Sequence, residues 1–249
     1  MSKFHVIQSI ANTTQKTIAR FPLEYITALV GMTATIILSE QVDQTPSFYF
    51  YTKIALSCSL SFVSFFSISL GFSESNNRVA RLLSSLLAGI LVFIFVFQFS
   101  EKITKVEFLQ FIVLNITLHL LVSFSAFIKN YNQERFWEFN KQLFLRVLLT
   151  GLYSFVLFLG LSLAILAVKQ LFNIELYEKI YFHLWLIIVI GFSPIFFLAG
   201  VPEMNSSNSQ LTLNYPNGLK KFTQFVLLPL ISIYLGILVI YEIKILITL

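Results

Sequence analysis

The residues best placed to carry chemistry are three polar side chains within one apolar run, Asn115, His119 and Ser123. They follow one another at intervals of four residues. Each such step turns a helix face by only about 40°, so the three side chains share one stripe. Polar side chains are costly in hydrocarbon, and the stripe is therefore a candidate substrate or proton pathway, with His119 as the titrating member. The alternative is an interhelical hydrogen-bond ladder that holds a bundle together.

Other patterns that carry chemistry are missing from the sequence. The three histidines lie far apart, Cys58 is the single cysteine, and there is no HExxH, GxSxG or P-loop motif. We therefore predict no catalytic residue, no metal site and no cofactor. A membrane-embedded enzyme acting on a lipid or lipid-linked substrate is the alternative function. It would need paired ionisable groups deep in a bundle, and the sequence offers His119 alone.

The composition shows what kind of element must position these residues. Of 249 residues, 57% are hydrophobic and 12% are charged, whereas a soluble domain has roughly 45–50% apolar and about 25% charged residues. A chain this short cannot bury so much apolar surface in a core of its own. The composition thus predicts an integral membrane protein whose first partner is the lipid bilayer.

Seven runs are long enough to cross a membrane as helices, which takes about 20 residues. They are Leu23–Ser39, Phe48–Leu70, Val79–Phe99, Phe108–Ile128, Leu143–Val168, Ile180–Gly200 and Phe222–Tyr241. Transmembrane β-strands would instead alternate over segments of about 10 residues. The predicted fold is therefore all-α, a polytopic transmembrane helical bundle of about seven spans.

The basic residues predict an orientation. With seven spans, eleven Lys and Arg residues fall on the side of the N-terminus and six on the other side. Cytoplasmic loops retain basic residues, so we predict a cytoplasmic N-terminus. The net charge of +5 lies at the ends of apolar runs and leaves no basic stripe for nucleic acid.

Two segments predict contact with the membrane surface. Residues 4–21 place apolar or small side chains on one helical face, which predicts a cytoplasmic amphipathic helix over residues 1–22 that leads into a transmembrane domain over residues 23–249. The segment Arg135–Lys141 mixes aromatic and basic residues at a predicted boundary, as an interfacial anchor requires.

Three sequence blocks carry a family resemblance. They are Leu148–Leu163, Phe196–Glu203 and Tyr215–Leu230, the last containing Pro-x-Gly-Leu and then Thr-Gln-x-Val-Leu-Leu-Pro-Leu. In order and in type they resemble a Bacteroidetes-type inner-membrane family, the domain of unknown function numbered 4153. The resemblance implies a polytopic helical membrane protein with no assigned catalytic residue. Members of this family continue into further spans, so we expect a chain ending at Leu249 to be shorter than its relatives.

These observations favour a non-enzymatic inner-membrane component, either transporter-like or a scaffold of the cell envelope. A transporter predicts that Asn115 and His119 face a hydrated cavity. A scaffold predicts a large apolar lateral surface for other envelope membrane proteins. The sequence indicates neither the substrate nor the oligomeric state.

Overall fold

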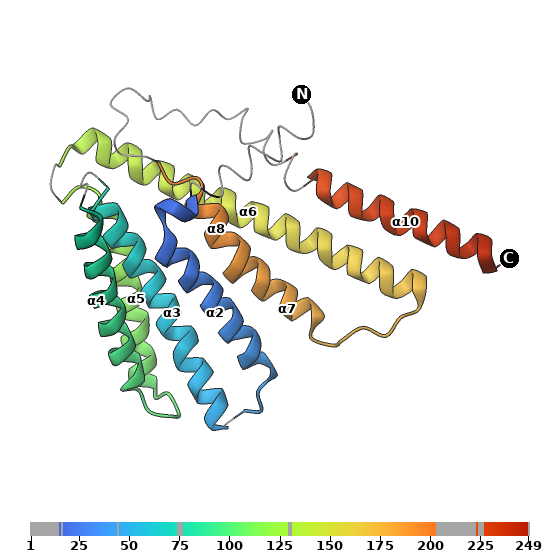
Figure 1. Cartoon of the computed structure of the whole chain (residues 1–249), viewed down its shortest axis with the longest axis horizontal. Coiled ribbons are helices and arrows are strands. Elements are labelled where there is room, and N and C mark those ends of the chain that lie inside the picture. The colour runs from blue at the N-terminus through green and yellow to red at the C-terminus, as the bar shows by residue number, and fades with distance from the viewer. Residues whose placement is uncertain are drawn as a thin grey trace.

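The computed structural model is all-α, with helices along nearly its whole described length (Figure 1). It describes residue 15 and residues 17–43, 45–73, 77–128, 131–202, 223 and 227–248. Within these residues, seven helical stretches are long and apolar enough to cross a membrane. They are α2 (Pro22–Glu40), α3 (Pro46–Gly71), α4 (Arg78–Phe97), α5 (Lys105–Ser125), α6 (Gln133–Phe172), a composite sixth span (Ile180–Leu198) and α10 (Leu228–Thr248). The predicted polytopic bundle is confirmed.

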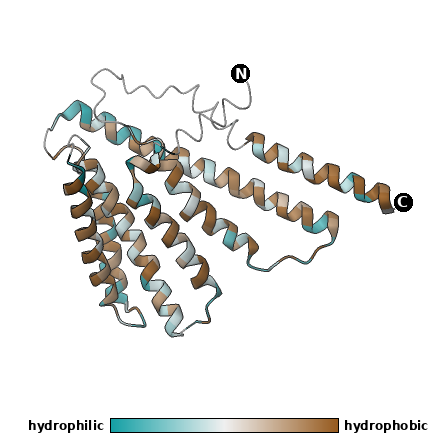
Figure 2. Ribbon diagram, in the orientation of Figure 1, coloured by the Kyte–Doolittle hydropathy of each residue, from teal (hydrophilic) through white to brown (hydrophobic). Residues whose placement is uncertain are grey.

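Successive spans run in opposite directions, so the bundle has two ends. We call the end at which α2 begins the proximal end and the end at which α2 stops the distal end (Figure 1). Hydrophobic residues cover most of the ribbon between the ends, while hydrophilic residues gather at the connections and at the start of α6 (Figure 2).

Helix α3 lies at the centre of the first four spans and packs against α2, α4 and α5. Small side chains let these helices approach closely. A Cβ added at Gly31 of α2 would lie 3.1 Å from the Cβ of Cys58, and one added at Gly89 of α4 would lie 2.9 Å from the ring of Phe65. Either glycine therefore fits its neighbour because it has no side chain.

The proximal end holds one buried apolar core to which four of the spans contribute. Its members are Phe21, Val63, Phe66, Leu70, Val122, Phe127, Phe139, Leu198 and Val201. Phe21 was predicted to lie on the apolar face of the N-terminal helix, and it is buried just before α2. Most of residues 1–22 lie outside the described residues.

Helix α6 is much longer than the predicted span over residues 143–168. Its 40 residues extend about 60 Å at 1.5 Å per residue, twice the thickness of a hydrocarbon core of about 30 Å. The side chain of Asn132 caps the helix by accepting a hydrogen bond from the backbone N–H of Arg135. The segment Arg135–Lys141 therefore forms the first turns of α6. Phe139 packs into the proximal core, while Trp137 is 67% exposed.

The sixth span is interrupted by a π-helix. It consists of α7 (Ile180–Leu186), the π-helix η1 (Ile187–Phe192) and α8 (Ser193–Leu198). Pro194 lacks the N–H that a regular α-helix would need at this point, and the backbone N–H and Oγ of Ser193 both bond to the carbonyl of Ile188. The wider turn also brings Gly191 against Met32 of α2.

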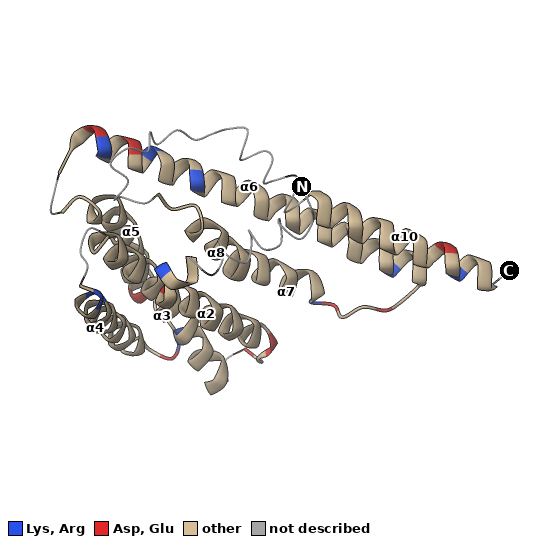
Figure 3. Cartoon of the chain, turned by 45° about the horizontal axis from the view of Figure 1, so that its top comes forward, with Lys and Arg blue, Asp and Glu red and all other residues tan. Residues whose placement is uncertain are grey.

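Helix α10 lies beside the distal part of α6 (Figures 1 and 3). Tyr234 donates a hydrogen bond to the carbonyl of Gly160 at 2.7 Å, and Leu230 packs on Tyr153. As described, α10 begins at Leu228 and continues to Thr248, past the predicted end at Tyr241.

Candidate functional site

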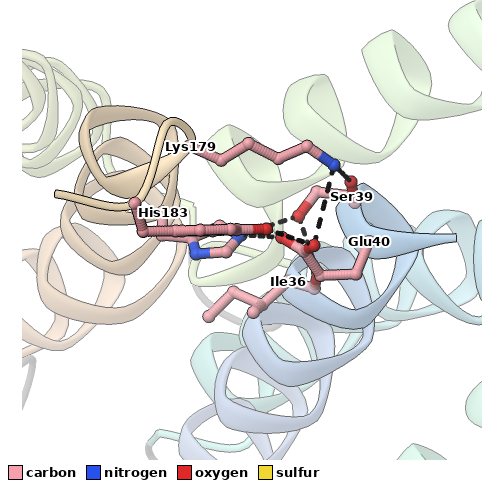
Figure 4. Close-up of polar contacts among 6 residues, drawn as sticks. Ile36, Ser39, Glu40, Lys179 and His183 are labelled. Carbon is pink, nitrogen blue, oxygen red and sulfur yellow. Dashed lines mark hydrogen bonds and ion pairs between the residues drawn. The ribbon is translucent and has the colours of Figure 1, made fainter. Parts of the chain in front are cut away.

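A polar cluster joins the end of α2 to the start of α7 at the distal end of the bundle. We call Ser39, Glu40, Tyr177, Lys179 and His183 the distal cluster (Figure 4). The Nε2 atom of His183 lies 2.7 Å from Oε1 of Glu40 and 3.0 Å from Oγ of Ser39. The Lys179 ammonium lies 3.7 Å from Oε2 of Glu40 and donates to the Ser39 carbonyl at 2.6 Å.

The hydrogen-bond directions of the distal cluster fix where its protons lie. The hydroxyl of Ser39 donates to the carbonyl of Ile36 at 2.7 Å, so its oxygen accepts from His183. Both partners of Nε2 are therefore acceptors, and Nε2 carries the proton. In a Ser-His-acid triad, the histidine accepts the serine proton on one nitrogen and bonds the carboxylate through the other. The distal cluster has neither feature. Its geometry is that of a structural contact between α2 and α7.

The phenol of Tyr177 completes the cluster by donating a hydrogen bond to Oε2 of Glu40. This bond and the nearby negative charge raise the pKa of Tyr177 above its ordinary value. Glu40 thus accepts from or pairs with three side chains that come from the connection before α7 and from α7 itself. The cluster anchors the composite sixth span to α2.

Lysines at the distal end bond to the last carbonyls of neighbouring helices. Lys53 of α3 donates to the carbonyl of Phe99 at 2.6 Å, just after α4 ends. Lys244 of α10 donates to the carbonyl of Leu171 at 3.1 Å, at the end of α6. Lys179 does the same for α2. The last carbonyls of a helix have no partner within it and carry partial negative charge, so each lysine neutralises a helix terminus.

Two arginines bond to backbone carbonyls at the proximal end, Arg146 at the end of α8 and Arg20 just beyond it. The guanidinium of Arg146 donates to the carbonyls of Phe196 and Phe197 and lies 4.3 Å from the Phe196 ring centroid. Arg20 donates to the carbonyls of Val201 and Pro202, both at 2.8 Å. Figure 3 shows that the charged residues gather at helix ends and on the first turns of α6.

Glu24 is an ionisable residue inside the bundle, with 1% of its surface exposed. It lies in the first turn of α2, where the helix dipole favours a negative charge. The hydroxyl of Ser69 on α3 donates to its Oε1 at 2.5 Å. The carboxylate therefore joins α2 to α3 near the proximal end.

Comparison with known proteins then places the chain. A family model described as a domain of unknown function, DUF4153, matches residues 26–249. The chain belongs to the DUF4153 family. No curated protein and no solved structure matches it. The resemblance stated from the three sequence blocks is thus confirmed, and it brings no activity with it.

The predicted stripe of this DUF4153 chain lies on α5, and its three members differ in their surroundings. Asn115 and Ser123 are half-buried, whereas His119 is exposed. Nδ1 of His119 lies 2.8 Å from the carbonyl oxygen of Asn115 in its own helix. The carbonyl of Ser123 accepts a bond from Asn140 of α6 at 3.3 Å. Neither a pathway nor a ladder is tested by these contacts, and both stay predictions.

The distal cluster and Glu24 were not identified as sites from the sequence. Ser39 and His183 are 144 positions apart, and no local pattern relates them. Glu24 carried a signal, since a carboxylate inside an apolar run demands a partner. Within the described residues, no three of His, Cys, Asp and Glu gather closely enough to hold a metal ion.

Proposed function

We propose that this chain is a non-enzymatic scaffold of the bacterial inner membrane, with a cytoplasmic N-terminus, that assembles with other membrane-spanning helices through its lateral surface. The observation that carries the proposal is the outer face of α10. A transporter-like protein is the alternative hypothesis. It depends on the polar stripe of α5, Asn115, His119 and Ser123, which is untested.

Helix α10 uses one face to pack on α6. Leu230, Tyr234, Tyr241 and Lys244 all contact α6 or the residues beside it. Their spacing places them on one side of the helix. The other sides carry exposed apolar side chains, including Leu235, which is 62% exposed, and Ile240, which is 58% exposed. These exposed sides of α10 can pack against a second helix as well as against lipid.

The face of α10 opposite α6 carries Ser232 and Gly236, which lie four residues apart and are both exposed. Small residues at this spacing let the backbones of two membrane helices approach closely, and this is a recurrent basis of their association. A Cβ added at Gly236 would meet nothing within 4 Å. The hydroxyl of Ser232 bonds to the carbonyl of Leu228 in its own helix at 2.9 Å, so it does not prevent close approach.

The contacts at the bundle ends support a structural part for the charged residues. Four basic side chains bond to carbonyls at helix ends, and the distal cluster joins two spans. These side chains therefore stabilise the fold. The exposed apolar lateral surface has no such structural part.

The proposal is tested by the substitution Gly236→Leu in the full-length protein. A branched side chain on this face blocks close helix approach, so we expect a marked loss of co-purifying membrane partners or of self-association in mild detergent. Gly151→Leu is the matched control, because Gly151 of α6 also has nothing within 4 Å of an added Cβ and its neighbours four residues away, Val147 and Phe155, are large.

The association is measured by crosslinking in membranes through a cysteine at position 236 in a Cys58→Ser background. A scaffold gives a specific crosslinked species that is missing for a cysteine at position 151. Equal crosslinking at both positions, or none in native membranes, would contradict the proposal. An unchanged elution volume and melting temperature would show that Gly236→Leu still folds.

A further inference from the structure

An open apolar groove lies between α4 and α5 on the lateral surface. Its volume is about 590 Å³, which falls within the range of small-molecule sites. The lining residues are Leu91, Val92, Phe95, Leu109, Gln110, Val113, Leu114 and Thr117. Six of these eight are apolar, and the hydroxyl of Thr117 is bonded to the carbonyl of Val113 at 2.8 Å.

The groove exists because α4 and α5 both pack on α3 and make few contacts with each other. Its floor is a buried apolar cluster in which Leu60 of α3 meets Val92 and Val96 of α4. Phe95 and Leu114 pack against that cluster from the two walls. The floor is therefore closely packed by apolar side chains, and the groove opens towards the hydrocarbon.

The depth of the groove distinguishes an acyl chain from a helix. On α5 it extends from Leu109 to Thr117, eight steps of 1.5 Å and thus about 12 Å. Half of a hydrocarbon core is about 15 Å. Since α5 begins at Lys105, the groove runs from just below the distal interface to near the middle of the membrane. An acyl chain from one leaflet matches this length, whereas a helix that crosses the membrane would extend well beyond the groove.

The polar residues at the distal end of the groove fit a phospholipid headgroup. Gln110 is exposed and has no described hydrogen bond, and an amide in hydrocarbon needs a partner such as an ester carbonyl. Lys102 and Lys105 are exposed, with no described ion pair, and lysine binds phosphate as a point charge. The carboxylate of Glu107 is occupied by Ser100 and Thr104, although Glu101 remains exposed beside Lys102.

We propose that the groove binds one acyl chain of a phospholipid from the distal leaflet, with the phosphate at Lys102 and Lys105 and the ester region at Gln110. This site is independent of the α10 surface and holds whether or not the scaffold function is correct.

The test uses full-length protein in vesicles of phosphatidylglycerol and phosphatidylcholine that contain a phosphatidylglycerol with a photoactivatable diazirine on one acyl chain. Val113 and Ile116 form a matched pair, because they are 57% and 55% exposed, lie on the same helix and differ in depth by less than one turn. Val113 lines the groove and Ile116 does not. We expect labelling near Val113 to exceed that near Ile116 by about threefold or more. A diazirine near the chain end should label Leu91 and Thr117, and one near the glycerol should label Phe95 and Leu109.

Groove-filling variants supply the second measurement. Val113→Trp and Leu91→Trp, one from each wall, should each reduce groove labelling by about threefold or more, while Ile116→Trp leaves it unchanged. The double variant Lys102→Gln and Lys105→Gln should reduce labelling without filling the groove, so it tests the site even if a tryptophan variant fails to fold. Equal labelling at Val113 and at Ile116 would overturn the proposal, as would protein crosslinks in place of lipid adducts at Val113.

Discussion

At the scale of single residues, Gly200 shows how one missing side chain permits a charged contact. A Cβ added at Gly200 would lie 1.9 Å from Nε of Arg146. The arginine could avoid it only by leaving the carbonyls at the end of α8. Hydrogen bonds to charged groups contribute about 1.5–3 kcal/mol each when buried, so displacement leaves costly unpaired groups.

We therefore expect Gly200→Ala to lower the free energy of unfolding by about 1.5–3 kcal/mol. The same change at Gly151 or Gly236, which are helical and face open space, should raise it by about 0.5–1 kcal/mol. Unfolding in a denaturing-detergent titration measures all three variants. An unchanged free energy of unfolding for Gly200→Ala would show that the hydrogen bonds of Arg146 do not require the missing side chain at position 200.

The ring of His119 bonds within its own helix and is exposed, so its removal breaks no described contact between helices. We expect His119→Leu to change the free energy of unfolding by less than about 0.5 kcal/mol. A loss of about 1 kcal/mol or more would indicate an interhelical bond, as the ladder hypothesis requires.

The pathway hypothesis for the same stripe has its own measurement. Cysteines placed at positions 115, 119 and 123 in a Cys58→Ser background should react with a water-soluble thiol reagent if they line a hydrated path. Three unreactive positions in folded protein would end that hypothesis.

At the scale of elements, the start of α5 is fixed by a capping box. The hydroxyl of Thr104 accepts from the backbone N–H of Glu107 at 3.3 Å, and the Glu107 carboxylate accepts from the backbone N–H of Thr104 at 2.7 Å. The pair satisfies donors that would otherwise have no partner at a helix N-terminus.

We expect Thr104→Ala to lower the free energy of unfolding by about 0.5–2 kcal/mol, because an alanine cap bonds no N–H. Glu101→Gln is the control in the same connection, since Glu101 is exposed, and it should stay within about 0.5 kcal/mol of the parent. Equal effects of the two substitutions would show that the box does not stabilise α5.

The elements that the sequence predicted best are those set by local composition. The bounds of α2, α3 and α4 agree with the predicted runs to within about two residues. The start of α6 was missed because polar residues such as Glu134 and Lys141 mark the end of an apolar run without ending a helix. The distal cluster could not be predicted, since its contacts depend on how α2 and α7 pack, and no spacing in the chain encodes that.

At the scale of the whole molecule, contacts with helix termini account for three of the lysines at the distal end. Lys53, Lys179 and Lys244 are three of the six basic residues on the distal side, and each bonds to the end of a neighbouring helix. Their ammonium groups bond to carbonyls within the fold. They are therefore weaker evidence for orientation in the membrane than lysines in free loops. Arg20 and Arg146 on the proximal side are bonded to carbonyls in the same way, so nine basic residues remain there against three on the distal side, a stronger asymmetry than eleven against six.

The central claim is that seven spans cross the membrane with the proximal end in the cytoplasm, and reporter fusions test it most directly. A reporter that is active only in the periplasm should be active when fused after Gln44, Thr104 or Ile174, in the distal connections. The same reporter should be silent when fused after Asn76, Asn132 or Asn208, in the connections that the basic residues predict to be cytoplasmic. Activity in the opposite pattern, or equal activity at all six positions, would contradict the account.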